Sequence, residues 1–276
     1  MKVLPFKIPK SRNTAIIFQI DTGPFYGQLH QHEELQMSAI IKGKGTLLIA
    51  DTIHHFQEGD LFVIGGQQPH VFRNESASAL MHTIFFNPQS FGDSFLDLEE
   101  GKGVRDFYAF AKAGFKTITT SEITTAFDAV SQNEGILRLA YFLQLIQLLT
   151  TSDATPIASF VYHKNITEAD GKKLHRIFEY SLQHFSEAIQ LQDIAEVAAM
   201  TTNGFCKYFK KRTNKTYVQF LTEIRISHAC TLLKEQPELS IADIALLSGF
   251  QTLSHFNRKF KQHKMISPSM YRTSLV

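Results

Sequence analysis

Three histidines and two neighbouring polar residues form the group of side chains best suited to bind a metal ion or a polar ligand. His30 and His32 are followed by Glu34 and Gln36 in strand-like sequence, and His70 comes later in the chain. Neutral imidazoles with a carboxylate are typical ligands of divalent metals such as zinc. Three interpretations are open: a structural or sensory metal site, a pocket whose histidines hydrogen-bond a polar effector such as a sugar or related metabolite, or histidines without a role.

The carboxyl-terminal part of the chain contains an internal repeat. Residues 191–200 (LQDIAEVAAM) align with residues 241–250 (IADIALLSGF) at an offset of fifty, and after one inserted residue 201–217 align with 252–268. Each copy encodes a short helix, a tight turn and a second helix. The alignment pairs Phe205 with Phe256, Lys207 with Arg258, Phe209 with Phe260 and Lys210 with Lys261.

The second helix of each copy has the pattern of a helix that reads the major groove of DNA. Its two phenylalanines lie four residues apart and are expected to face the core, which leaves polar and cationic side chains outward. We expect Lys207 and Arg258 to suit guanine, and Asn203 and Asn257 to suit adenine. The predicted DNA-binding residues are Thr201, Thr202, Asn203, Cys206, Lys207 and Lys210 in the first copy and Thr252, Ser254, His255, Asn257, Arg258 and Lys261 in the second. The alternative is a pair of helical hairpins in an unrelated bundle, with solvated charges.

Other catalytic chemistry is sparse in the sequence. It contains neither a phosphate-cradling glycine motif with Lys-Ser or Lys-Thr nor a Gly-x-Ser-x-Gly nucleophile elbow. Residues 32–36 (HEELQ) lack the second histidine of a zinc-protease motif. A redox role for Cys206 is weaker than its interpretation as a small neutral residue beside Lys207. We therefore expect that the chain is not an enzyme.

The coarse secondary structure changes along the chain. Residues 15–87 alternate like short strands with glycine turns, residues 91–149 have a helical period, and residues 150–160 are polar and interrupted by Pro156. From about residue 168 onward the pattern is helical. Residues 217–236 are expected to form one helix of roughly 27 to 30 Å, comparable with the roughly 34 Å between successive major grooves on one face of DNA.

Composition and charge agree with two domains of different character. The chain has 276 residues, 43% hydrophobic and 20% charged, which is enough for a sizeable core. From Asp170 to the end, 15 Lys and Arg stand against 9 Asp and Glu, whereas residues 1–169 hold 13 against 17. The basic part is therefore expected to meet a polyanion. Two cysteines, the absence of a signal-peptide pattern and the absence of an eighteen-residue apolar run favour a cytoplasmic protein without a membrane segment.

Residues 170–276 resemble the DNA-binding domain of the AraC/XylS family of transcription regulators. The resemblance is carried by SIADIALLSGFQTLSHFNRKFKQHKMISPSMYR, with Ile-Ala, Gly-Phe, Ser-x-Phe, Arg-x-Phe-Lys and Ser-Pro-x-x-Tyr-Arg at the family's spacings. Met265 departs from the pattern, since the family usually has glycine there. Methionine tolerates a left-handed conformation poorly, so we expect this helix to end differently from the first, where Asn214 stands.

The amino-terminal part is similar to the cupin-like effector domain often found in this family. His30-Gln31-His32, Gln36 and Gly43 resemble the first cupin motif, and Gly59-Asp60, Pro69-His70 and Asn74 echo the second. In metal-binding cupins a glutamate completes the set of histidines. Here Gln36 stands at that position, and Glu34, two residues away on the same face of a strand, is the candidate substitute.

These observations predict a multidomain α and β protein that regulates transcription. We expect a cupin-like β-barrel at 1–90, a helical extension at 91–150, a linker at 151–168 and an all-α double helix-turn-helix domain at 169–276, with units at about 191–213 and 240–263. Leu139, Phe142, Leu143, Ile146 and Leu149 suggest either a homodimer seam or a cover for the barrel. The expected partners are double-stranded DNA, a small effector and RNA polymerase, and the resemblance favours an activator. The alternative is a metal-dependent cupin enzyme with an accessory helical domain.

Overall fold

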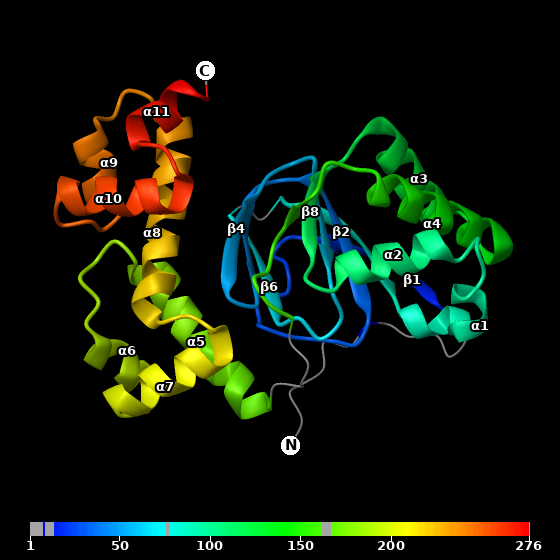
Figure 1. Ribbon diagram of the computed structural model, residues 1–276, viewed down its shortest axis with the longest axis horizontal. Coiled ribbons are helices and arrows are strands. Elements are labelled where there is room, and N and C mark those ends of the chain that lie inside the picture. Colours follow the sequence, from blue (N-terminus) through cyan, green and yellow to red (C-terminus); the bar gives the residue numbers. More distant parts are fainter. Residues whose placement is uncertain (1–7, 9–13, 76–77, 162–166, 276) are drawn as a thin grey trace. The chain divides into compact units, whose positions relative to one another are not determined.

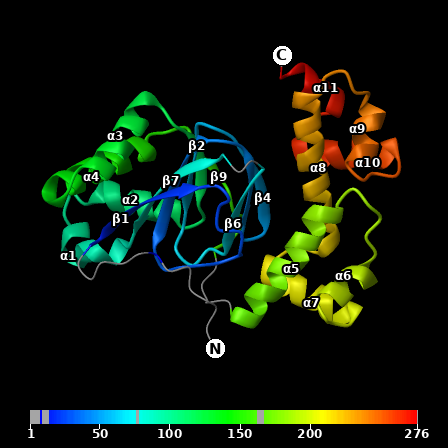
Figure 2. The ribbon, with the colours of Figure 1, turned by 180° about the vertical axis from the view of Figure 1, so that it is seen from behind.

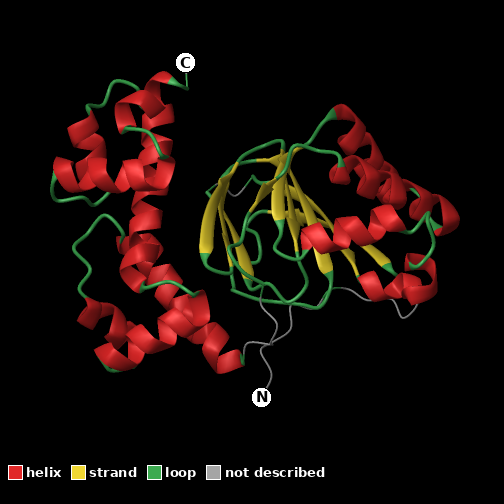
Figure 3. Ribbon diagram, in the orientation of Figure 1, coloured by secondary structure: helices red, strands yellow, loops and turns green. Residues whose placement is uncertain are grey.

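The computed structural model describes residues 8, 14–75, 78–161 and 167–275, whose contacts divide into two compact units (Figure 1). One unit comprises the described residues up to 168 except for 51–53, and the other comprises the described residues from 169 onward together with 51–53. The first contains β-sheets and helices, and the second is built from helices (Figure 3). Among the residues that the structure describes, no helix is both long enough and apolar enough to cross a bilayer.

Two antiparallel sheets form the amino-terminal barrel. The larger has the order β1-β7-β2-β5-β8-β9 and the smaller the order β4-β3-β6. The strands are β1 (Ile16–Thr22), β2 (Leu35–Lys42), β3 (Gly45–Ile49), β4 (Thr52–Phe56), β5 (Asp60–Ile64), β6 (His70–Asn74), β7 (Leu80–Phe86), β8 (Phe115–Ile118) and β9 (Thr155–Pro156).

Strand alternation gives the larger sheet two different faces. On β2, Leu35, Met37 and Ala39 belong to a core on the outer face of the sheet, whereas Ile40 belongs to the core between the sheets. Gln36 and Ser38 share the inner face with Ile40, because successive side chains of a strand point to opposite sides. Odd-numbered residues from Leu35 to Ala39 therefore face the outer core, and even-numbered residues from Gln36 to Ile40 face the barrel interior.

Helices cover the outer face of the larger sheet. Beyond β7 follow η1 (Pro88–Phe91), α1 (Gly92–Leu96), α2 (Lys102–Ala111), α3 (Ser121–Gln132) and α4 (Gly135–Thr150). Figures 1 and 2 show α2, α3 and α4 on the same flank of the sheet from opposite directions. Phe142, Ile146 and Leu149 of α4 are buried in the core that includes Met37, and Leu139 and Leu143 pack against it. These five side chains therefore cover the barrel, the second of the two interpretations.

The helical extension and the linker both need correction. β8 lies within the stretch predicted to be helical and pairs with β5, while β9, in the predicted linker, pairs with β8. Gly114 makes this return possible: its φ is +77°, and an added Cβ would lie 2.9 Å from the Val63 carbonyl oxygen. Ile157 is buried and its amide donates to the Gly114 carbonyl at 3.1 Å. The chain thus remains part of the barrel beyond Thr150.

The carboxyl-terminal unit has two small helical groups along one long helix. Its helices are α5 (Glu168–His184), α6 (Leu191–Val197), α7 (Thr202–Thr213), α8 (Tyr217–Glu235), α9 (Ile241–Leu247), α10 (Leu253–Lys264) and α11 (Pro268–Thr273). Figure 1 shows α6 and α7 near one end of α8, and α9, α10 and α11 near its other end. With 19 residues, α8 is about 28 Å long. The repeat seen in the sequence therefore corresponds to two helix-turn-helix units joined by a rigid spacer.

The turns inside the two units are built alike from different residues. Ala199 has a φ of +52° and Gly249 a φ of +80° at the matching point of the second unit. Gly249 cannot be replaced freely, because an added Cβ would lie 2.5 Å from the Phe185 carbonyl oxygen. The recognition helices also end alike, with Asn214 at a φ of +56° and Met265 at +64°. The expectation that Met265 changes the end of its helix is wrong, since packing of α10 overrides the residue's own preference.

Candidate functional site

Two phenylalanine anchors fix α7 in the first unit. Phe205 and Phe209 are fully buried, and Phe209 lies 5.5 Å, between ring centroids, from both Tyr217 and Phe220 of α8. Lys207 stands midway between the two anchors in sequence. Since each residue turns a helix by about 100°, Lys207 lies on the opposite face from both anchors. It is exposed there, as are Asn203 and Lys210.

The second unit repeats this geometry in α10. Phe256 and Phe260 are fully buried with ring centroids 5.5 Å apart, and Phe260 lies 5.5 Å from Tyr271 of α11. Arg258 stands midway between these anchors and is exposed. Both helices therefore present a cation at the same register on the face opposite their aromatic anchors.

All twelve predicted DNA-binding residues lie at exposed positions of the two units. They are not equivalent in position or role. Thr201 and Thr252 are helix N-caps whose hydroxyls accept from the amides of Gly204 and His255 at 3.2 and 3.3 Å. Each such hydroxyl keeps a hydrogen to donate. By helical rotation the outermost side chains are Asn203, Lys207, Lys210, Ser254, Arg258 and Lys261, whereas Cys206 and Asn257 lie on the flank.

Electrostatics around α10 favour an anionic partner. Burial, followed by the nearby charges of Arg258 and Lys259, lowers the pKa of His255. The last turn of α10 also carries Lys261, His263 and Lys264, and burial with neighbouring lysines lowers the pKa of His263 as well. Positive charge is thus concentrated on this helix, as a phosphate-contacting surface requires.

In the barrel, the structure brings His30, His32 and His70 together. One ring nitrogen from each lies within 4.8 Å of the other two, and all three residues are buried. His30 and His70 exchange backbone hydrogen bonds of 3.1 and 2.8 Å between β6 and the segment before β2. Burial, offset in part by a backbone hydrogen bond, lowers the pKa of His30 to about 3. Burial and the two neighbouring histidines also hold the pKa of His70 well below its usual range. Both rings are therefore neutral.

Gln36 connects this histidine group to a row of polar side chains on the inner face of the larger sheet. Its carbonyl oxygen Oε1 lies 3.0 Å from Nε2 of both His32 and His70, and its amide nitrogen Nε2 donates to Ser38 Oγ at 2.8 Å. Ser38 Oγ lies 3.1 Å from Thr83 Oγ1. A continuous set of hydrogen-bonded side chains therefore runs along the barrel interior from the histidines to β7.

Glu34 does not substitute for the missing carboxylate. Its carboxylate lies 3.7 Å from Nδ1 of His32, and its backbone carbonyl accepts a hydrogen bond from that nitrogen at 2.9 Å. The Glu34 carboxylate lies on the Nδ1 side of the His32 ring. Because β2 begins only at Leu35, Glu34 is outside the strand, and the alternation of strand side chains does not place it on the same face as Gln36. The expectation of Glu34 as a fourth metal ligand is wrong.

The polar row includes side chains that the sequence analysis missed. Asp21 accepts a hydrogen bond from Gln19 Nε2 at 2.5 Å, and burial, offset by hydrogen bonds from Gln19 and Thr83, raises the pKa of its carboxyl. A usable signal was present: Gln19 and Asp21 on β1, like Gln36 and Ser38 on β2, are polar at two successive inward positions. We name the row formed by Gln19, Asp21, Gln36, Ser38 and Thr83 the inner polar row.

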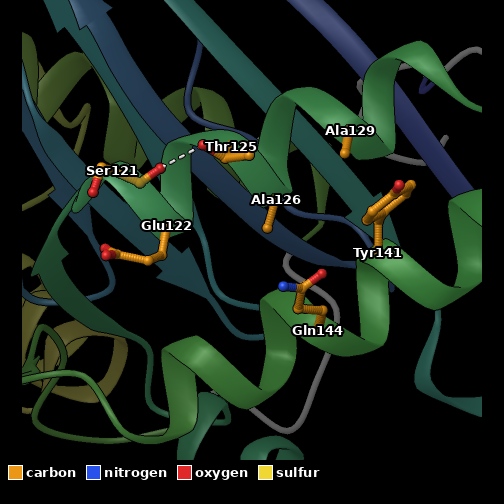
Figure 4. A pocket seen from close by; sticks show the side chains of 7 residues that line it. All are labelled: Ser121, Glu122, Thr125, Ala126, Ala129, Tyr141 and Gln144. Atoms are coloured by element: carbon orange, nitrogen blue, oxygen red, sulfur yellow. Dashed lines mark hydrogen bonds between the residues drawn. The ribbon is translucent and has the colours of Figure 1, made fainter.

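A separate surface groove of about 320 Å³ lies between α3 and α4 (Figure 4). Ser121, Glu122, Thr125, Ala126 and Ala129 line it from α3, and Tyr141 and Gln144 line it from α4. None of the residues predicted from the sequence contributes to it. Its position on the outside of the helical cover separates it from the barrel interior.

Comparisons with known proteins identify both parts of the chain. Residues 194–274 match the family described as a helix-turn-helix domain, and residues 16–85 match the cupin domain family. The HTH-type transcriptional activator RhaR of Mannheimia succiniciproducens is 24% identical over 256 residues, covering 90% of this chain and 88% of the relative. An uncharacterized HTH-type transcriptional regulator of Haemophilus influenzae is 26% identical over 259 residues, covering 86% and 85%. The crystal structure of ToxT from Vibrio cholerae covers 95% of this chain and 98% of its own at 16% identity and a TM-score of 0.39.

A cupin-like ligand-binding domain followed by a double helix-turn-helix domain defines a DNA-binding transcriptional regulator rather than an enzyme. These matches are the ones that AraC-type transcriptional regulators with an amino-terminal cupin domain give, and the chain is similar to such regulators over both of its parts.

Proposed function

We propose that this regulator responds to a small polar effector held in the barrel and reads promoter DNA with α7 and α10 in adjacent major grooves. The observation that carries the proposal is the matched register of Lys207 and Arg258, each opposite two buried phenylalanines at the two ends of α8. A spacer of about 28 Å suits two grooves roughly 34 Å apart along one face of B-DNA.

We assign the outer faces of α7 and α10 different tasks. Lys207 and Arg258 are suited to guanine. Asn203 is exposed about one turn before Lys207 on the outer face of α7, and it is suited to adenine. Lys210 and Lys261, one turn further along, are suited to phosphate. Asn257 lies on the flank of α10. We therefore expect it to contact a base at the edge of the DNA sequence that α10 reads, and not a base at its centre.

The effector is proposed to bind among His30, His32, His70 and the inner polar row. These groups offer several hydrogen-bonding atoms inside an otherwise apolar barrel, which is the usual composition of a small-molecule site. A hydroxyl-rich molecule such as a sugar or a related metabolite fits this chemistry. The description of RhaR as a transcriptional activator favours activation. Effector binding would change promoter occupancy by favouring one arrangement of the two domains.

Dimerisation, polymerase contact and a cytoplasmic location complete the proposal. Ile136 and Leu137 at the start of α4 are 81% and 54% exposed, on the same helical cover that carries the groove in Figure 4. An exposed apolar pair of this kind is suited to contact a second copy of the chain. An activator bound at a promoter also has to contact RNA polymerase, and both activities place the protein in the bacterial cytoplasm.

DNA binding at increasing salt tests the proposal directly. The full-length protein is titrated by fluorescence anisotropy into a duplex selected from a random library, and the logarithm of the affinity should fall linearly with the logarithm of the salt concentration. Lys210→Ala should reduce that slope by about one, as expected for one lost phosphate contact. An affinity that is insensitive to salt, or a slope unchanged in the variant, contradicts the assigned DNA surface.

A further inference from the structure

We propose that Arg225, in the middle of α8, is a positioning residue that fixes the orientation of α7 relative to α10 and thereby sets the spacing between the two DNA sites that one chain reads. The inference rests on the proposed function, in which both recognition helices enter the major groove. Arg225 is not among the twelve residues predicted from the sequence to bind DNA.

Arg225 stands between the parts of α8 that belong to the two helix-turn-helix units. Towards the amino terminus of α8, the ring of Phe220 lies 5.5 Å, between centroids, from that of Phe209 in α7. From Ile226 onward, buried side chains of α8 join the core that contains Phe256 of α10. Each unit is thus anchored on its own stretch of α8, so contacts at the boundary determine how the units are oriented relative to each other.

The Arg225 guanidinium binds the segment that leads into the first unit. Its Nε donates to the Phe185 carbonyl oxygen at 2.7 Å, and its Nη2 donates to the Glu187 carbonyl oxygen at 2.7 Å. These two carbonyls lie between the end of α5 at His184 and the start of α6 at Leu191. Because the guanidinium is planar and presents its donors in a fixed fork, two hydrogen bonds hold this segment in one orientation on α8.

The turn inside the second unit packs against the same group. At Gly249 an added Cβ would lie 2.5 Å from the Phe185 carbonyl oxygen and 2.9 Å from Nε of Arg225. His228, about one turn after Arg225 on α8, extends the contact. Its Nδ1 lies 3.2 Å from Oγ of the fully buried Ser248, and its ring lies 4.7 Å, between centroids, from the Phe185 ring. The segment before α6 and the turn before α10 therefore meet at Arg225.

A fixed orientation of the two units makes DNA affinity depend on the spacing of the two sites. Each added base pair moves the second site by about 3.4 Å along the duplex and rotates it by about 34°. A rigid pair of recognition helices matches one such arrangement, and it binds that arrangement tightly because little orientational freedom is lost. Without the Arg225 hydrogen bonds the units gain freedom to tilt about α8. The preferred spacing then binds less tightly, and neighbouring spacings are accepted.

A series of duplexes with different spacings tests this inference. They carry the two sites of the selected duplex with centres about 8 to 13 base pairs apart, and the full-length protein is titrated by fluorescence anisotropy. We expect the wild type to lose at least about tenfold in affinity when the best spacing changes by one base pair, and Arg225→Met to lose less than about threefold. Arg225→Lys, which keeps a charged donor without the fork, should lie between them. The control Lys234→Met removes the same charge from the last turn of α8 and should keep the wild-type preference.

The outcomes separate this inference from the proposed function. The same spacing preference in Arg225→Met as in the wild type, or a loss by one common factor at every spacing, would overturn the role of Arg225. Scrambling each site in turn tests the proposed function. If scrambling one of them leaves the wild-type affinity unchanged, only one unit reads DNA, and the proposed function is contradicted.

A distance measurement in the free protein tests the orientation without DNA. Spin labels are attached to the exposed native Cys206 of α7 and to Gln262→Cys at an exposed position of α10, in full-length protein with Cys230 replaced by alanine. Double electron–electron resonance should give one narrow distance distribution with Arg225 intact and a broader one in Arg225→Met. A broad distribution with Arg225 intact, or an unchanged one in the variant, would refute the inference.

Discussion

Replacement of Arg258 by alanine should relax the sequence preference of the second DNA-reading unit at one base pair. Arg258 is exposed and stands two residues from each of the buried anchors Phe256 and Phe260, so it lies about 200° around the helix from both. A bidentate contact between arginine and guanine discriminates by about 1 to 3 kcal/mol, which corresponds to a loss of about 5- to 150-fold in affinity for the preferred site. Affinity for a scrambled duplex should fall much less.

Lys259→Ala is the matched control for this substitution. It removes the same charge from the same helix, but Lys259 lies on the flank of α10 opposite to Asn257, is half-buried and hydrogen-bonds to Gln262 at 3.3 Å. The assay is fluorescence anisotropy of the full-length protein on the selected duplex and on duplexes with single base-pair changes. If Arg258→Ala weakens all duplexes by one common factor, Arg258 contacts phosphate and its assignment to a base is refuted.

Three further predictions concern stability. Phe260→Ala, like Phe209→Ala in the first unit, should lower the free energy of unfolding by about 3 to 5 kcal/mol in urea titrations, because each removes a fully buried anchor. A loss below about 1 kcal/mol would mean that this phenylalanine does not anchor its helix to the core. Met265→Gly should raise the free energy of unfolding by up to about 1 kcal/mol, since it relieves a left-handed conformation at +64°, whereas a decrease would show that the side chain stabilises the turn. His30 and His70 stay neutral in the folded protein, so as the pH falls the unfolded chain binds protons at these histidines before the folded protein does. The barrel should therefore lose stability progressively as the pH falls from 6.5 towards 3. A urea unfolding midpoint that stays constant below pH 6.5 would contradict the burial of the two rings.

The sequence predicted the carboxyl-terminal unit in most of its detail. A repeat at an offset of fifty aligned two apolar patterns of helical period, and each phenylalanine pair fixed which face of its helix is buried. The exception was Met265, whose left-handed backbone is imposed by the packing of α10 and α11 and is not a property of the residue. The local pattern of apolar residues was enough to predict which face of each recognition helix is buried.

The barrel was predicted only at the level of its strands. β8 has four residues between helices, and its pairing with β5 joins positions more than fifty residues apart, which local periodicity does not encode. The histidines were identified from their spacing, but their relation to Gln36 depends on a contact between β2 and β6. Glu34 was misassigned because the sequence does not show where β2 begins. The parts of the barrel that the sequence did not predict depend mainly on pairing between distant residues, and less on the type of each residue.

Methylation protection of guanine N7 along the selected duplex is the most direct test of the central claim, that α7 and α10 of one chain occupy successive major grooves. We expect two protected clusters per subunit, separated by about 10 base pairs, one lost in Lys207→Ala and the other in Arg258→Ala. A single protected cluster, or two clusters that both disappear in either variant while the protein remains bound, would contradict it.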